Sequence, residues 1–106
     1  MKTVEDLLDV IITKTSIDIV MIESIRRCYV HQTNEGTYDV AYVVSMGNSQ
    51  YAIVVFHHNN DDAEIYTIHG HRHSSRIKQL RQCGFNDLDI HEITDFSLEE
   101  IRNLHT

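Results

Sequence analysis

Residues 37–58, TYDVAYVVSMGNSQYAIVVFHH, decide the fold of this chain. Two runs rich in β-branched and aromatic residues, 37–46 and 49–58, stand on either side of Gly47 and Asn48. A Gly-Asn pair between two such runs is typical of a β-hairpin with a two-residue turn. The sequence therefore predicts an antiparallel hairpin at the centre of the fold.

A two-residue turn also predicts the register of this hairpin. Met46 then opposes Ser49, and Val40 opposes Val55, on one bulky face. The opposite face carries smaller side chains and forms a shallow apolar surface, made of Ala41, Val43, Ser45, Ala52, Val54 and Phe56.

Capping and periodicity predict the elements around the hairpin. Thr3 with Asp6 forms a capping box for a helix over roughly 4–13. Beyond it we expect strands at 17–25, 26–32, 63–69 and 88–93, turns at 33–36 and 59–62, a helix from Ser74 or Ser75 to Cys83, and a last helix over 98–105 boxed by Ser97 and Glu100. The predicted fold class is α+β, an antiparallel sheet of about five strands with two or three short flanking helices, and residues 1–106 form a single domain.

Composition narrows the class of protein. The chain has 106 residues, a net charge of −7 and 42% hydrophobic residues, and it has no long uncharged apolar run, so no membrane association is expected. The amino terminus carries acidic residues where a secretory signal needs basic ones, and we therefore expect a cytoplasmic protein. Cys28 and Cys83 lack metal-type spacing and are interpreted as reduced, partly buried thiols.

The distribution of charge bears on the partner. Residues 85–106 contain six acidic side chains and one basic, whereas residues 71–84 contain four basic side chains and no acidic one. An acidic surface repels nucleic acid and favours approach to a basic protein groove, so no direct nucleic-acid partner is predicted. The commoner explanation of an acidic balance is that it keeps a small protein soluble.

Two segments have residues of the kinds found in ligand sites. His69, His71 and His73 alternate along the chain as zinc ligands on a strand would, but solvated or packing histidines are the commoner interpretation, and we predict no metal and no cofactor. The basic segment 71–81 lies at an expected helix start and leaves open a phosphate or RNA contact. The chain lacks nucleophile elbows, phosphate-binding glycine loops and paired zinc-hydrolase histidines, so an enzyme is not expected.

Three features of the chain resemble the phage-type uracil-DNA glycosylase inhibitors over roughly residues 3–68. They are the capped helix with Asp6-Leu7-Leu8, the triplet Glu23-Ser24-Ile25 after an apolar run, and the strand start at Val30-His31. In that family the strand with the Glu-Ser-Ile sequence enters the DNA groove of the enzyme and imitates backbone phosphates. The sheet contributes to an apolar pocket that captures a leucine of the enzyme.

The resemblance implies a partner-binding site in this chain. Glu23, Ser24 and Ile25 would face a basic DNA-binding groove, that of uracil-DNA glycosylase, and the pocket would be formed by Val30, Ala41, Val43 and Val54. Another phage-encoded inhibitor of host defence, of the anti-CRISPR or anti-restriction kind, is the nearest alternative. A ligand- or RNA-binding module that uses residues 71–81 is the alternative from a different class.

Overall fold

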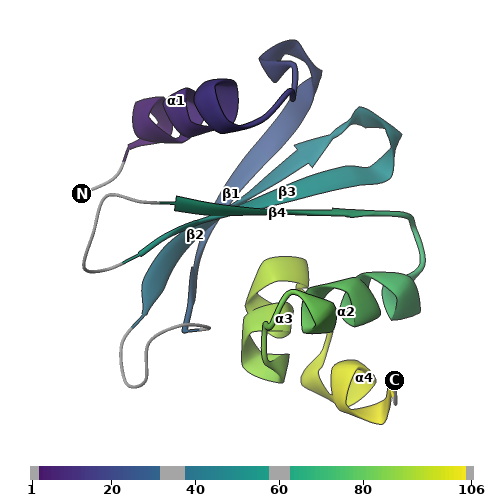
Figure 1. Cartoon of the computed structure of the whole chain (residues 1–106). Helices are drawn as coiled ribbons and strands as arrows, with labels where there is room; N and C mark the ends of the chain where they lie inside the picture. The colour runs from purple at the N-terminus through teal and green to yellow at the C-terminus, as the bar shows by residue number, and fades with distance from the viewer. Residues whose placement is uncertain (1–2, 32–37, 58–62, 105–106) are drawn as a thin grey trace.

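The computed structural model describes residues 3–31, 38–57 and 63–104, which form a four-stranded antiparallel sheet with helices on both faces (Figure 1). The strand order is β1-β2-β3-β4. The elements are α1 (Val4–Lys14), the 3₁₀ turn η1 (Ile19–Met21), β1 (Ile22–Val30), β2 (Asp39–Met46), the 3₁₀ turn η2 (Gly47–Ser49), β3 (Gln50–Phe56), β4 (Ala63–His69), α2 (His73–Gln82), α3 (Asp87–Thr94) and α4 (Leu98–Asn103). The predicted α+β class is confirmed, with four strands rather than five.

Helix α1 begins at the predicted capping box. The Thr3 amide donates to Asp6 Oδ2 at 2.9 Å, and the Asp6 amide donates to Thr3 Oγ1 at 3.3 Å. Two free amides at the helix start are thereby satisfied. Leu7 and Ile11, one turn apart, are fully buried and attach the helix to the sheet.

Two segments predicted as separate strands, 17–25 and 26–32, form a single strand that begins after a 3₁₀ turn. The side chain of Asp18 accepts a hydrogen bond from the Val20 amide at 3.0 Å and caps η1. The chain therefore becomes extended only at Ile22, and the segments predicted as strands 17–25 and 26–32 form one strand, β1. The turns predicted at 33–36 and 59–62 lie outside the described residues.

The central hairpin is present, but its predicted register is wrong by one residue. Its loop contains three residues, Gly47–Ser49, so Met46 pairs with Gln50 instead of Ser49. Asn48 and Ser49 have positive φ angles of 67° and 62°, which places the left-handed bend one residue later than a Gly47-Asn48 turn would. Because side chains alternate along a strand, the shift moves every β3 residue to the other face.

The strand predicted at 88–93 is helix α3. The side chain of Asn86 accepts a hydrogen bond from the Asp89 amide at 2.8 Å and starts the helix. Ile90 and Ile93, at helical spacing, are both buried against the sheet. The alternation of Leu88 and Ile90 resembled a strand because the segment is short.

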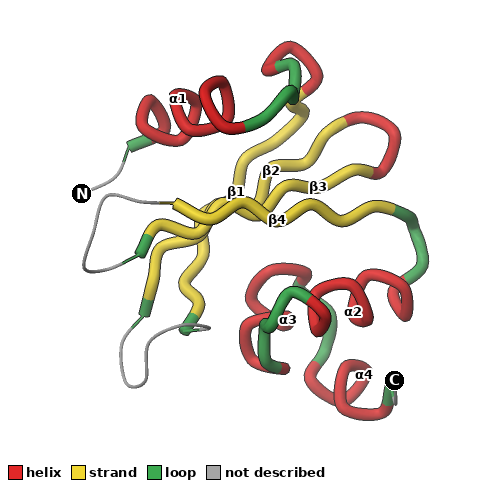
Figure 2. The backbone as a smooth tube through the Cα atoms, viewed as in Figure 1, coloured by secondary structure: helices red, strands yellow, loops and turns green. Residues whose placement is uncertain are grey.

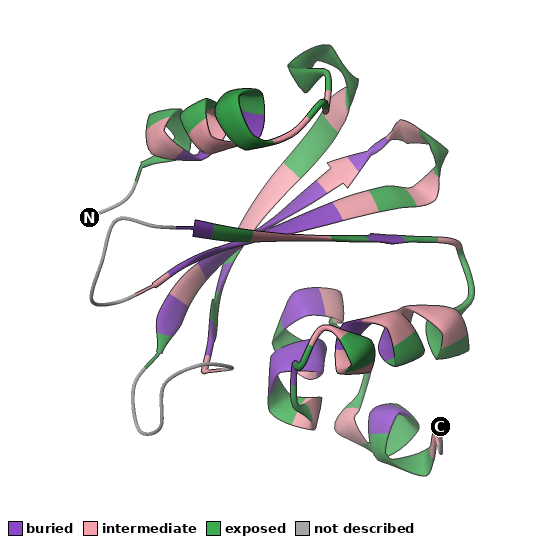
Figure 3. Cartoon of the chain, in the orientation of Figure 1, coloured by how far each residue is buried: buried purple, intermediate pink, exposed green. Residues whose placement is uncertain are grey.

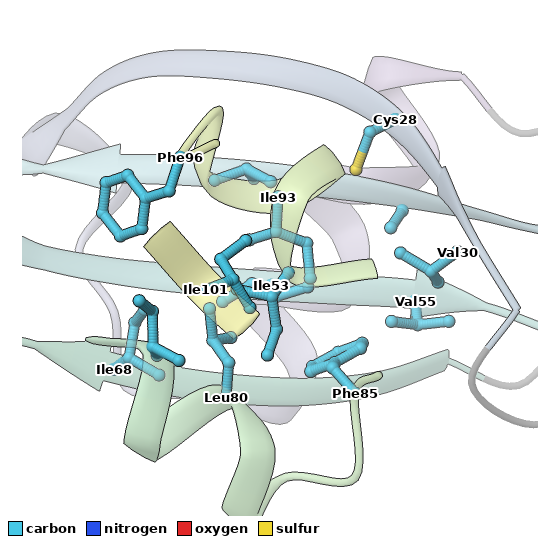
Figure 4. Packing of buried hydrophobic residues seen from close by; sticks show 14 residues of the cluster. Cys28, Val30, Ile53, Val55, Ile68, Leu80, Phe85, Ile93, Phe96 and Ile101 are labelled. Carbon is cyan, nitrogen blue, oxygen red and sulfur yellow. The ribbon is translucent and has the colours of Figure 1, made fainter. Parts of the chain in front are cut away.

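Two cores lie on opposite faces of the sheet. Figure 2 shows α1 on one side of the sheet and α2, α3 and α4 on the other, and Figure 3 shows buried positions along the strands between them. Between the sheet and α2, α3 and α4 is the helix-side core, shown in Figure 4, which contains Val30, Val43, Ile53, Val55, Ile68, Leu80, Phe85, Ile93 and Ile101. Between the sheet and α1 is the α1-side core, which contains Leu7, Ile11, Tyr42, Val44, Ala52, Val54 and Phe56. Strands β2 and β3 are therefore covered on both faces. None of the helices in the described ranges is both long and apolar enough to cross a membrane.

Two separate leucine substitutions test whether α1 packs on the sheet. Leu7→Ala removes a fully buried side chain and should lower the free energy of unfolding by about 2–5 kcal/mol. Leu88→Ala, at a half-exposed position of α3, should change it by less than about 0.5 kcal/mol. Urea unfolding of both variants provides the measurement, and equal midpoints would show that α1 does not dock as described.

Candidate functional site

The first strand presents a free edge with the Glu-Ser-Ile triplet at its start. Within the described ranges β1 pairs only with β2. The pairing is irregular at Glu23, since Ile22 pairs with Met46 and Ser24 with Ser45, so Glu23 is bulged out of the ladder. Glu23 and Ser24 are exposed. The triplet therefore lies at the start of β1. The sequence had suggested that it lies at the end of a strand.

An exposed apolar turn precedes this edge. Val20 in η1 is 83% exposed, and its neighbours Ile19 and Met21 are about half exposed. An apolar residue at this level of exposure gains little from folding, so the turn is a candidate contact surface for another protein. Glu23 and Ser24 follow this turn in the chain after Ile22, which is partly buried against the α1-side core.

A cavity of about 490 Å³ opens beside the triplet. We call it the edge pocket, and it is lined by Ser24, Ile25, Arg26, Val43, Ser45, Tyr51, Ile68, Arg76, Ile93, Thr94 and Asp95. Its residues come from all four strands, from α2 and from the end of α3. Val43, Ile68 and Ile93 give it buried apolar surface, and Ser24 and Ser45 are small polar groups.

Arg26 in this pocket is held by the end of α3. Its guanidinium donates to the main-chain oxygen of Glu92 at 2.8 Å and to that of Ile93, and its Nε lies 3.9 Å from the Asp95 carboxylate. These carbonyls belong to the last turn of α3, where they lack helical partners and carry partial negative charge. Arg26 thus fixes α3 to β1 and is not free to bind an anion.

Arg76 is held in a similar way. Its Nε donates to the Gly70 main-chain oxygen at 2.8 Å, and its guanidinium carbon lies 4.3 Å from the centre of the Tyr51 ring. Both arginines of the edge pocket therefore have partners within the fold. What remains for a ligand is a mainly apolar recess beside the exposed strand.

The apolar pocket predicted from four sheet residues is not formed as expected. Val54 lies in the α1-side core, on the face opposite Val30, Ala41 and Val43, because of the one-residue register shift. Val30 and Ala41 are fully buried in the helix-side core. Of the four residues only Val43 lines the edge pocket. Ile68 and Ile93 were missed, since they are brought there by β4 and by a helix that the sequence did not predict.

The three alternating histidines do not converge. The amide of His69 donates to Gln79 Oε1, and the ring of His71 lies 2.9 Å from Ser49 Oγ. His73 stacks on the Phe96 ring, with centroids 3.8 Å apart, and lies 2.8 Å from a Glu100 oxygen. Within the described part of the chain no group of three or more His, Cys, Asp or Glu residues is arranged to hold a metal ion.

The basic segment 71–81 is also partly used by the fold. Arg81 donates to the main-chain oxygens of Leu104 at 2.6 Å and Ile101 at 2.7 Å, at the end of α4. Arg72 and Lys78 are exposed. Helix α2 starts without a side-chain cap, but two exposed cations are a weak basis for a phosphate or RNA site.

A further cluster of ionisable groups includes a buried carboxylate that the sequence did not indicate. Asp39 is 1% exposed and lies 3.5 Å from His57 Nδ1, while His57 Nε2 lies 3.2 Å from Glu64, as expected from the strand pairing. A hydrogen bond from Tyr66, helped by His57, lowers the pKa of Glu64. The cluster links β2, β3 and β4 at one end of the sheet.

Neither thiol has the character of a nucleophile. Burial raises the pKa of Cys28 to about 11, and burial also raises the pKa of Cys83. The two cysteines do not form a disulfide with each other, and both remain protonated at neutral pH. The edge strand and its pocket therefore provide groups suited to binding another molecule, with no activated thiol beside them.

Comparison of the chain with protein-family models, with curated proteins and with solved structures gives no match.

The role of Arg26 in holding α3 can be tested by comparing substitutions of Arg26 and Arg27. Arg26→Lys keeps the charge but cannot reach two carbonyls at once, so the free energy of unfolding should fall by about 1–2 kcal/mol. Arg27→Lys, at an exposed position of the same strand, should cost less than about 0.5 kcal/mol. Thermal or urea unfolding measures both, and an unchanged Arg26→Lys protein would contradict the anchoring role.

Proposed function

We propose that this chain is a small inhibitor protein that blocks uracil-DNA glycosylase by DNA mimicry. The observation that carries the proposal is the juxtaposition of the exposed Glu23-Ser24 pair, on the free edge of β1, with the edge pocket beside it. A mimic of this kind needs both a polar strand for a basic groove and a recess for an apolar side chain.

The polar part of the mimic consists of Glu23 and Ser24. Neither side chain makes a hydrogen bond or ion pair with another described residue, so their oxygens are available to a partner. The bulge takes Glu23 out of the regular pairing, and its carboxylate lies beside Gly47 of the loop between β2 and β3. In a groove built to bind phosphates, a carboxylate and a hydroxyl satisfy the cations and donors that DNA oxygens would. The net charge of −7 favours encounter with such a groove.

The apolar part is the edge pocket instead of the four-residue pocket expected from the sequence. Val43, Ile68 and Ile93 supply an apolar lining, and the cavity of about 490 Å³ has room for one aliphatic side chain of the partner. Burying such a side chain in a recess beside an electrostatic contact is a common arrangement for interface hot spots. The exposed η1 turn would widen the contact.

The same structural features bear on the two alternative functions. An anti-CRISPR or anti-restriction protein would use the same Glu23-Ser24 pair against a different basic groove. A module that binds RNA through residues 71–81 has less support, because Arg76 and Arg81 are bonded to main-chain carbonyls of the fold.

The direct test is uracil excision. The purified protein should abolish excision from a uracil-containing oligonucleotide at a near-equimolar ratio to the glycosylase, without itself binding the duplex. Association with the enzyme should slow as salt increases, because opposite charges steer the encounter. Full excision at a large molar excess of the protein would refute the proposal.

Three variants separate the strand from the pocket. Glu23→Arg should slow association about tenfold with little effect on dissociation. Ser45→Phe places a ring in the edge pocket and should speed dissociation at least about tenfold, which corresponds to about 1.4 kcal/mol. Glu99→Arg, the same charge reversal at an exposed site of α4, is the control and should change either rate by less than about twofold. If the first two variants keep their thermal midpoints and bind as the wild type does, the assigned surface is wrong.

A further inference from the structure

A second cavity, of about 530 Å³, lies where β1 ends and α3 begins. We call it the tyrosine pocket, and it is lined by Tyr29, His31, Tyr38, Leu88, Asp89 and Glu92. Tyr38 is 65% exposed, and Tyr29 and Leu88 are half exposed. Large apolar side chains gathered around a cavity at this level of exposure are typical of a binding site.

The wall of this pocket contains a buried carboxylate with an unpaired oxygen. Asp89 is 1% exposed, and its Oδ1 accepts hydrogen bonds from the His31 amide at 3.0 Å and from His31 Nδ1 at 2.7 Å. Its Oδ2 is closed to water and has no hydrogen-bond partner among the described residues. A buried carboxylate oxygen without a donor is costly, and a cation in the adjoining cavity would offset part of that cost.

Hydrogen bonds from two neighbouring residues hold the Asp89 carboxylate in the wall of the pocket. Asn86 Oδ1 accepts from the Asp89 amide at 2.8 Å, and the Asn86 Nδ2 atom lies 3.0 Å from His31 Nε2. His31 Nδ1 in turn lies 2.7 Å from Asp89 Oδ1. His31 and Asn86 therefore fix the orientation of Asp89 beside the cavity.

The pocket therefore combines aromatic walls with negative charge. Glu92 adds a second, exposed carboxylate. Two arginines touch pocket residues without lining the cavity: Arg26 donates to the Glu92 main-chain oxygen, and the Arg27 guanidinium carbon lies 5.4 Å from the centre of the Tyr29 ring. The contact of Arg27 shows that the Tyr29 ring accepts a guanidinium in this setting.

We propose that the tyrosine pocket binds a guanidinium group, as carried by an arginine side chain of another protein. A planar cation can stack on the tyrosine rings while its N–H groups meet the Glu92 carboxylate, and the charge of Asp89 attracts it through the wall. Guanidinium is favoured over an ammonium ion because it stacks on aromatic faces and is less strongly hydrated. The proposal does not depend on the glycosylase, since it concerns a separate pocket of the free protein.

The probe is N-acetyl-arginine amide, and its binding is measured by NMR of the Leu88 methyl groups and the tyrosine rings. We expect saturable shifts confined to this pocket. N-acetyl-citrulline amide, the neutral counterpart, should bind at least about tenfold more weakly, and N-acetyl-lysine amide should bind more weakly than the arginine probe. Equal shifts with the citrulline probe, or shifts spread over the acidic surface, would overturn the proposal.

Variants test the carboxylates separately. Glu92→Gln and Asp89→Asn should each weaken arginine-amide binding at least about fivefold. Glu99→Gln removes an equal charge from an exposed site of α4 that is not part of the pocket, and it should leave the affinity within about twofold. If Asp89→Asn fails to fold, Tyr38→Leu at the exposed rim replaces it and should also weaken binding. The site would be disproved if Glu92→Gln bound the arginine amide as the wild type does and Asp89→Asn, or Tyr38→Leu in its place, did so too.

Discussion

The pairing of β2 with β3 is the constraint on which the rest of the structure depends. Both strands are covered on both faces, so their register decides which side chains meet α1 and which meet α2, α3 and α4. With Val43 opposite Ile53 and Tyr42 opposite Val54, one alternating set of side chains fills each core. A shift of one residue exchanges the two sets on β3. The two outer strands and every helix are then positioned by the surfaces that this central pair presents to them.

Local signals in the sequence predicted what local contacts determine. The capping box of α1, the presence of the hairpin and the start of the last helix at Ser97 each depend on a few adjacent residues, and each is present in the structure. The register was not predictable, because Asn48 and Ser49 adopt positive φ where Gly47 and Asn48 were the expected pair. Helix α3 was missed because a short alternating run fits both periods. These errors affected the prediction of the site most. Glu23 and Ser24 could be proposed from the sequence, but the residues that line the edge pocket come from segments far apart in the chain.

Three arginines of this acidic chain are bonded to main-chain oxygens of the fold. Arg26 binds the last carbonyls of α3, Arg81 binds those at the end of α4, and Arg76 binds the loop before α2. Arg26 and Arg81 thereby place positive charge at helix ends where main-chain oxygens lack partners and the dipole is negative. The side chains of Arg26, Arg76 and Arg81 are therefore occupied by the fold and are less available to pair with acidic residues of the surface.

The bulge at Glu23 has a consequence for how the protein behaves at high concentration. A nine-residue strand with an open edge is a template for pairing with further copies and hence for aggregation. The bulge interrupts the regular spacing of main-chain donors and acceptors at one end of this edge, and Arg26 and Arg27 add charge along it. Fibril growth from this edge would require burying these charges in a misaligned ladder. The same irregularity that takes Glu23 out of the ladder thus opposes edge-to-edge association between copies of this chain.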